Sequence, residues 1–92
     1  MILEELEAVL HERRSADPAG SYTAELLADP ERIQRKIMEE AFEVCLELGR
    51  SENDPALTAE EAADVIYHLL VGLVSVDVPL ADVLAVLEGR RS

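Results

Sequence analysis

Residues 62–76 constrain the fold more than any other stretch, because the sequence AADVIYHLLVGLVSV is apolar on most sides of the helix that it predicts. A helix with so little polar surface lies at the centre of a bundle or at a contact between subunits. Polar or small side chains nevertheless follow one line along it: Glu61, Asp64, His68, Gly72 and Ser75. A buried carboxylate is unfavourable unless it is paired or bound to a metal. The stretch therefore predicts a helical protein with carboxylates turned toward its interior.

Apolar spacing and two repeated start signals divide the chain into helices. Asp29 with Pro30, and Asp54 with Pro55, each place an N-cap residue before a proline at the first helical position. Gly49 is expected to end the helix before the second start signal in the left-handed conformation. The expected helices span residues 2–14, 22–28, 30–48, 55–76 and 80–87, followed by a basic, frayed tail. No segment is typical of a strand, so the predicted fold class is all-α.

Composition limits the classes of protein that fit this pattern. A chain of 92 residues makes one domain, residues 1–92, and its net charge of −12 repels nucleic acid and anionic membranes. A single cysteine cannot form an internal disulfide, and the acidic N-terminus is not typical of a secretory signal. The longest apolar run is too short to span a bilayer. We therefore expect a cytoplasmic protein that binds neither nucleic acid nor membrane.

Two pairs of acids three positions apart lie in unusual surroundings: Glu40 with Glu43, and Glu61 with Asp64. The chain has 20 acidic residues, so about four such pairs are expected by chance, and a solvated charged face is the first alternative. The surroundings argue against it. Glu40 and Glu43 lie between two apolar flanks of their helix, and Asp64 lies too far into an apolar run to be a cap.

The helix expected over residues 30–48 has an apolar stripe with a charged line beside it. The expected core stripe consists of Ile33, Ile37, Ala41, Val44 and Leu48, and the buried arc is widened by Met38, Phe42 and Cys45. The charged line consists of Lys36, Glu40, Glu43 and Glu47. Within these sets, Cys45 is expected to be inert packing, and Glu47 is expected to reach solvent near the helix end.

The four paired carboxylates converge if the two long helices pack antiparallel across the turn at residues 51–55. Such a cluster could not ionise fully at pH 7 without a counter-charge, which one or two divalent cations would supply. Ligands that are all oxygen favour Mg²⁺ or Mn²⁺ over zinc, and the Glu-x-x-His pairs of di-iron bundles are missing. A metal held in this way suits phosphoryl chemistry. Nearby cations would hold the rest of a polyphosphate: Arg32, Arg35 and Lys36.

Three of these residues also fit structural roles. Lys36 fits equally well an ion pair with the acid four positions later. Thr58 and Glu61 fit a capping box, although the earlier start signal competes with it and the box leaves the second acid of the pair unexplained. A histidine on an apolar helix is often a satisfied core residue, so His68 is open to a core role and to a functional one.

The two acidic pairs, separated by 17 intervening residues, resemble the ExxE…ExxD signature of the all-α nucleoside triphosphate pyrophosphohydrolases. Within that superfamily the chain resembles the phosphoribosyl-ATP pyrophosphohydrolases of histidine biosynthesis. The matching stretches are SYTAELL (21–27), ERIQRKIMEEAFEV (31–44), EEAADVIYHLLV (60–71) and PLADVLAVLE (79–88). With the first helix, they cover almost the whole chain in order. The resemblance implies a bundle of four to five helices that is completed by oligomerisation, as a homodimer or a higher homo-oligomer.

The resemblance also implies an activity, namely Mg²⁺-dependent hydrolysis of phosphoribosyl-ATP between its α and β phosphates. The products would be phosphoribosyl-AMP and pyrophosphate, in the second step of histidine biosynthesis. The implied metal ligands and catalytic residues are Glu40, Glu43, Glu61 and Asp64, with Mn²⁺ as a possible substitute metal. The implied substrate-binding residues are Lys36, Arg32, Ser21, Tyr22 and His68.

Other matches to the family have less defined roles. Thr23 belongs to the family's SYT loop and Tyr67 to its YH pair. Ser21, which also belongs to that loop, fits a helix cap equally well. Met38 departs from the family, which usually has glycine at this position, and its larger side chain can alter packing beside the site.

Two other functions remain as alternatives. The chain could be an all-α pyrophosphohydrolase that acts on another, non-canonical nucleoside triphosphate. It could also be a non-catalytic acidic helical oligomer whose carboxylates are solvated. Assays of phosphoribosyl-ATP against a panel of nucleoside triphosphates distinguish the first alternative from the phosphoribosyl-ATP activity. The effect of Mg²⁺ on thermal stability distinguishes the second alternative from a metal site, because a metal that binds only the folded state stabilises it.

Overall fold

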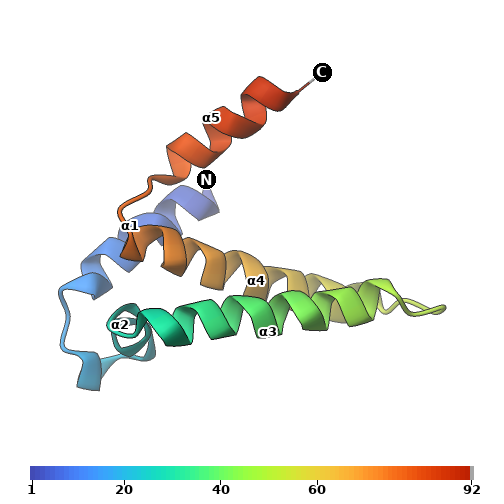
Figure 1. Cartoon of the computed structure of the whole chain (residues 1–92), viewed down its shortest axis with the longest axis horizontal. Coiled ribbons are helices and arrows are strands. Elements are labelled where there is room, and N and C mark those ends of the chain that lie inside the picture. Colours follow the sequence, from blue (N-terminus) through green and yellow to red (C-terminus); the bar gives the residue numbers. More distant parts are fainter. Residues whose placement is uncertain (92) are drawn as a thin grey trace.

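The computed structural model describes residues 1–91, which contain helices but no strand. The elements are α1 (Ile2–Arg14), the 3-10 turn η1 (Pro18–Gly20), α2 (Tyr22–Leu27), α3 (Pro30–Leu48), α4 (Pro55–Ser75) and α5 (Leu80–Arg90). Helices α3 and α4 form a long hairpin, α1 and α2 pack near one end of it, and α5 projects away (Figure 1). The predicted all-α fold class is confirmed.

Helices α2, α3 and α4 start where the sequence predicts. Ser21, Asp29 and Asp54 each accept a hydrogen bond from a backbone amide two or three residues later, which satisfies a donor that has no partner within the helix. The capping box at Thr58 is wrong. The Thr58 hydroxyl donates instead to the backbone oxygen of Asp54, because the helix has already begun at the earlier signal.

The helix ends differ from expectation in two places. Gly49 has a φ of −86°, so the left-handed cap predicted there is wrong. Helix α5 continues to Arg90 instead of ending at Leu87, and it takes in the start of the tail that was expected to fray. Ser92, at the end of that tail, lies outside the described residues.

The left-handed residue lies instead after α4, at Asp77, where φ is 59°. The amides of Asp77 and Val78 donate to the carbonyls of Val74 and Leu73, at 3.1 and 3.0 Å, and this pair of bonds is a Schellman motif. Arg14 also donates to the Val74 carbonyl at 3.1 Å and pairs with the Asp77 carboxylate. The end of α1 is therefore fastened to the end of α4.

The hydrophobic core lies at the end of the hairpin that α1 and α2 cover. Its buried side chains come from all five α-helices: Leu10, Leu26, Ile33, Leu70, Val71, Val74 and Leu80. The amide of Leu80 donates to Glu7 Oε2 of α1 at 2.7 Å. This bond supplies the cap that α5 lacks at its own N-terminus and holds the start of that helix against the core.

The buried face of α3 is rotated from the predicted stripe. Ile33 is buried and Ile37 and Val44 are partly buried, but Ala41 and Leu48 are exposed, so those two assignments are wrong. The residues turned inward are Ile33, Ile37, Glu40, Val44 and Glu47, at alternating spacings of four and three. The prediction that Glu47 reaches solvent is wrong, because α4 covers this face and leaves only 8% of the residue exposed.

Large apolar side chains remain uncovered on α3 and on α5. On α3 they include Met38, Phe42, Leu46 and Leu48, and on α5 they include Leu84, Val86 and Leu87. The predicted burial of Met38, Phe42 and Cys45 is wrong within this chain, because α4 packs on a different face of α3. The radius of gyration is 14.6 Å, whereas a compact domain of this length is expected to have a radius of gyration of about 12 Å.

Among residues 1–91, no single helix is long and apolar enough to cross a membrane. Helices α4 and α5 together pass that test of length and composition, as a pair bent by 115°.

Candidate metal and substrate site

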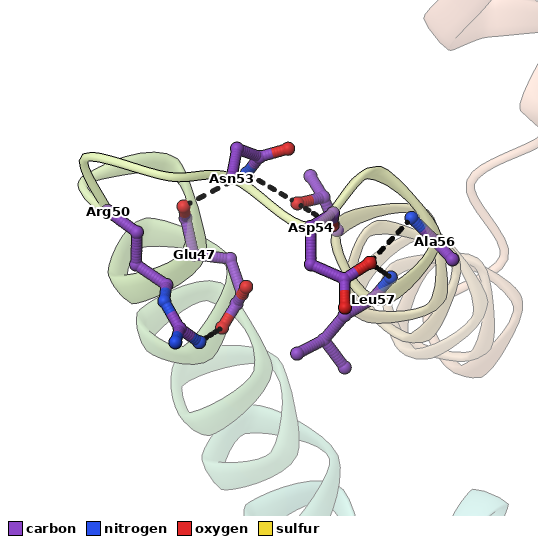
Figure 2. A network of polar contacts seen from close by, with 7 residues as sticks. Glu47, Arg50, Asn53, Asp54, Ala56 and Leu57 are labelled. Carbon is purple, nitrogen blue, oxygen red and sulfur yellow. Dashed lines mark hydrogen bonds and ion pairs between the residues drawn. The ribbon is translucent and has the colours of Figure 1, made fainter.

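A network of polar contacts holds the turn between α3 and α4 (Figure 2). Asn53 Nδ2 donates to the backbone oxygen of Glu47 at 3.1 Å and to Thr58 Oγ1 at 2.7 Å. It thereby satisfies a carbonyl at the end of α3 and ties it to the first turn of α4. Arg50 pairs with Glu47 Oε1 at 3.0 Å on the same turn. The turn is therefore held on both sides, and α3 and α4 face each other along the hairpin.

With this facing, the hairpin brings carboxylates from both helices together. Oxygen atoms of Glu40, Glu43 and Glu61 all lie within 4.8 Å of one another. Asp64 is outside that group of three and is exposed, one turn beyond Glu61 on α4. The antiparallel packing expected for the two acidic pairs is therefore found, with three of the four side chains in close contact.

Two carboxyls of the cluster, those of Glu40 and Glu61, have a raised pKa. Burial is the largest cause of a raised pKa at Glu40, and the negative charges of Glu43 and Asp64 add to it. The pKa of Glu61 is raised first by a hydrogen bond with the Glu43 carboxyl and then by burial and the neighbouring charges. These directions mean that full ionisation of the cluster is unfavourable unless a cation binds.

One oxygen of this cluster is a specific candidate for a metal bond. Glu40 Oε2 is buried and has no hydrogen-bond partner within the described structure. A buried carboxylate oxygen without a donor is costly, and coordination to a cation would satisfy it. The donors are all carboxylate oxygens, as in sites for hard divalent cations such as Mg²⁺ and Mn²⁺. The residues present therefore fit such an ion.

His68 lies beside the cluster on α4 and is buried, with 7% of the residue exposed. Its Nδ1 is 2.9 Å from the backbone oxygen of Asp64, which can only accept, so Nδ1 carries a hydrogen and donates. The other ring nitrogen, Nε2, is buried and has no hydrogen-bond partner among residues 1–91. The Nδ1 atom of His68 thus has the hydrogen bond expected of a core histidine, whereas its Nε2 atom is available to bind a polar group.

The basic residues predicted near the site lie in the first half of α3. Arg32 pairs with Glu25 of α2 at 2.8 Å, and its guanidinium lies 5.3 Å from the ring centre of Tyr22. Lys36 pairs with Glu39 at 3.8 Å, so the alternative of an ion pair with the acid four positions later is wrong. A contact of 3.8 Å between partly exposed side chains is a weak restraint. The Lys36 ammonium can therefore turn toward an anionic ligand.

Arg35 and Ser21 have contacts of their own. Arg35 is exposed and pairs with Glu39 at 3.9 Å. Ser21 caps α2 by accepting from the amide of Ala24 at 3.3 Å, which is the structural role that its position allows. The next residue, Tyr22, is about half exposed.

Two features were not predicted from the sequence. The first is the burial of Glu47, whose Oε2 has no partner in the described structure. The second is a hydrogen bond of 2.6 Å between Thr23 Oγ1 and the Tyr67 hydroxyl, which joins α2 to α4 across 44 positions of the chain. Local spacing gives no signal for either, because both depend on how separate helices pack.

Comparison with known proteins supplies the family. A family model described as phosphoribosyl-ATP pyrophosphohydrolase matches residues 3–91. Similar proteins named phosphoribosyl-ATP pyrophosphatase include one from Cereibacter sphaeroides, 52% identical over 91 residues that cover 98% of this chain and 86% of the relative. Another, from Roseobacter denitrificans, is 50% identical over 93 residues that cover 100% of this chain and 87% of the relative. The chain therefore belongs to the phosphoribosyl-ATP pyrophosphohydrolase family.

Proposed function

We propose that this protein hydrolyses phosphoribosyl-ATP to phosphoribosyl-AMP and pyrophosphate, in the second step of histidine biosynthesis. The names of its relatives support the substrate and the reaction. The observation in the structure that most supports hydrolysis of a phosphoric anhydride is the convergence of Glu40, Glu43 and Glu61 from two helices. A site of this kind concentrates negative charge and suits a cation that in turn binds phosphate oxygens.

The proposed metal ligands are Glu40, Glu43, Glu61 and Asp64, with Mg²⁺ as the metal and Mn²⁺ as a substitute. When bound, the ion supplies charge for the phosphate oxygens and lowers the pKa of a bound water. Asp64 is exposed one turn from Glu61, and we propose that it joins the other three carboxylates through a change of side-chain rotamer.

The proposed substrate-binding residues lie on α3 and α4 and at the start of α2. Arg32 and Lys36 lie on α3, two turns and one turn before Glu40, and present positive charge for the polyphosphate. Tyr22 and Ser21 lie at the start of α2, next to Arg32. His68 offers its Nε2, for which the described residues supply no partner, as a hydrogen-bond acceptor.

Assays on a panel of substrates test the proposed reaction. We expect phosphoribosyl-ATP to be hydrolysed with a higher kcat/KM than ATP or non-canonical nucleoside triphosphates, and the activity to be lost in EDTA and restored by Mg²⁺. A preference for a nucleoside triphosphate would instead assign the chain a different substrate.

A matched pair of variants tests the metal ligands. Glu61→Gln removes one charge from the cluster, and Glu60→Gln removes one charge from the exposed neighbouring position. We expect Glu61→Gln to lower kcat at least about a hundredfold, as loss of charge stabilisation in a transition state does. Mg²⁺ at about a hundred times its Kd stabilises the wild-type fold by about 2.7 kcal/mol, and this gain should vanish in Glu61→Gln alone. Equal behaviour of the two variants would remove Glu61 from the site.

We further propose that residues 1–92 form one domain that assembles as a homodimer or a higher homo-oligomer in the cytoplasm. The uncovered apolar side chains of α3 and α5 support assembly, because contiguous exposed apolar surface is typical of protein contacts. The single cysteine supports a reducing compartment. The net charge of −12 argues against nucleic acid and anionic membranes as partners.

A further inference from the structure

The hydrogen bond between Thr23 and Tyr67 connects two groups of residues that the proposed site needs. The oxygen atoms are 2.6 Å apart, and the bond is partly buried. Thr23 directly follows Tyr22, and Tyr67 directly precedes His68, whose ring packs edge-on against it at 5.1 Å between centres. The Thr23 end of the bond is therefore next to Tyr22, a proposed substrate-binding residue. The Tyr67 end is one helical turn from Asp64, a proposed metal ligand.

Helix α2 depends on such contacts for its orientation. It has six residues, which is far below the length at which an isolated helix is stable in water. Two of them, Ala24 and Leu26, are buried and hold α2 against the core. Burial of apolar side chains is not directional, so it fixes the depth of the helix better than its rotation. A hydrogen bond has preferred angles and fixes that rotation.

The rotation of α2 decides where Tyr22 and its partner lie. The Tyr22 ring faces the Arg32 guanidinium at 5.3 Å, and Arg32 also pairs with Glu25 of α2 at 2.8 Å. A rotation of α2 about its own axis would displace both residues that Arg32 contacts on this helix, Tyr22 and Glu25. The orientation of this arginine, which we assign to the phosphates, is therefore coupled to α2.

We propose that Thr23 and Tyr67 are positioning residues, whose hydrogen bond holds Tyr22 and Arg32 at a fixed place relative to the carboxylate cluster. The pair does not touch the reacting atoms in this account. It acts by keeping substrate contacts in register with the metal ligands, and small errors in such placement lower catalytic efficiency. The inference rests on the proposed substrate role of Tyr22 and Arg32.

Steady-state kinetics of Tyr67→Phe, Thr23→Val and the double variant test the proposal. Each single variant removes one hydroxyl and keeps the shape of the side chain. We expect KM to rise about three- to tenfold, as loss of one hydrogen bond predicts, with a smaller change in kcat. The double variant should resemble the single ones, because both remove the same bond. Thr23→Ser keeps the hydroxyl and should therefore have the same KM as the wild type.

Two further measurements separate positioning from stability and from metal binding. Mn²⁺ affinity should be unchanged in all variants, because the carboxylates are intact, and hydrogen exchange should rise in the amides of α2. A fall in Tm with an unchanged KM would overturn the proposal, as would effects on KM that multiply in the double variant. If the wild type prefers another nucleotide, the same comparison is made with that substrate, so an error in the substrate assignment stays separate from an error about this bond.

Discussion

At the scale of single residues, Glu40 has a raised pKa and a buried oxygen without a hydrogen-bond partner in the described part of the chain. In the unfolded chain its carboxyl titrates near about pH 4.3. Because the pKa is higher in the folded state, the folded protein holds the proton more tightly, and ionisation of Glu40 lowers stability as the pH rises. The penalty is absent below about pH 4 and is fully present above the folded-state pKa.

Glu40→Gln tests this account in metal-free protein. The variant keeps the shape of the side chain and cannot ionise, so we expect its Tm in EDTA to exceed that of the wild type by a few degrees at pH 7. The difference should shrink toward zero near pH 4. With Mg²⁺ added, the order should reverse, because only the wild type keeps this ligand. Thermal unfolding from pH 4 to pH 8, with and without Mg²⁺, measures both effects.

Asp77 shows the opposite shift. A hydrogen bond from Arg14 and the arginine's charge hold the pKa of Asp77 below its usual value. The stability that this pair contributes is therefore present above the unfolded-state pKa, about 3.9, and is lost as the pH falls through the lower folded-state value. Asp77→Asn isolates the charge, since asparagine also accepts a φ of 59°. We expect a lower Tm at pH 7 and convergence with the wild type below about pH 3.

At the scale of elements, the sequence predicts where helices start better than which face of a helix is buried. Ser21, Asp29 and Asp54 cap their helices through bonds to amides two or three positions away, so the signal is local. Helix α3 has apolar residues on two faces, and its inward face is chosen by α4. The prediction therefore placed Leu48 inside and Glu47 outside, the reverse of what α4 imposes.

In the candidate site, too, local features were predicted from the sequence, whereas features set by packing between helices were not. Spacing along each helix predicted the two acidic pairs, and the short turn predicted that they would face each other, as Glu40, Glu43 and Glu61 do. The exposed position of Asp64 and the hydrogen bond between Thr23 and Tyr67 depend on how separate helices pack against one another. No local pattern carries that information.

The turn between α3 and α4 is the element whose change should affect the site from a distance. Asn53→Ala removes two hydrogen bonds that link the end of α3 to the start of α4. We expect a loss of about 1–2 kcal/mol in the free energy of unfolding, together with weaker Mn²⁺ binding. Glu52→Ala, at an exposed position of the same turn, is the control and should change neither quantity. Denaturant unfolding and metal titration measure the two effects. Wild-type metal affinity in Asn53→Ala would mean that the turn does not set the facing of the carboxylates.

At the scale of the whole molecule, many large apolar side chains stay exposed, which supports the proposed assembly of several copies. Phe42 is 62% exposed and lies on a face of α3 that no helix within residues 1–91 covers. Helix α5 is attached through its first residue, Leu80, while Val86 and Leu87 remain exposed. The radius of gyration above that of a compact domain fits the same conclusion. A second copy of the chain, with matching apolar faces, would cover such surfaces without a new partner.

Phe42→Lys tests this assembly directly. A lysine in a dry contact between copies leaves an unpaired charge, so we expect the mass measured by light scattering to fall from a multiple of 10.1 kDa to 10.1 kDa itself. Gln34→Lys adds the same charge at an exposed polar position of the same helix and should leave the assembly intact. If the copies complete the bundle, the monomeric variant should also unfold at a lower temperature, and its Tm should not depend on protein concentration as that of the wild type does. A wild type that is already monomeric at micromolar concentration would contradict the proposed assembly and leave the apolar face of α3 to a different partner.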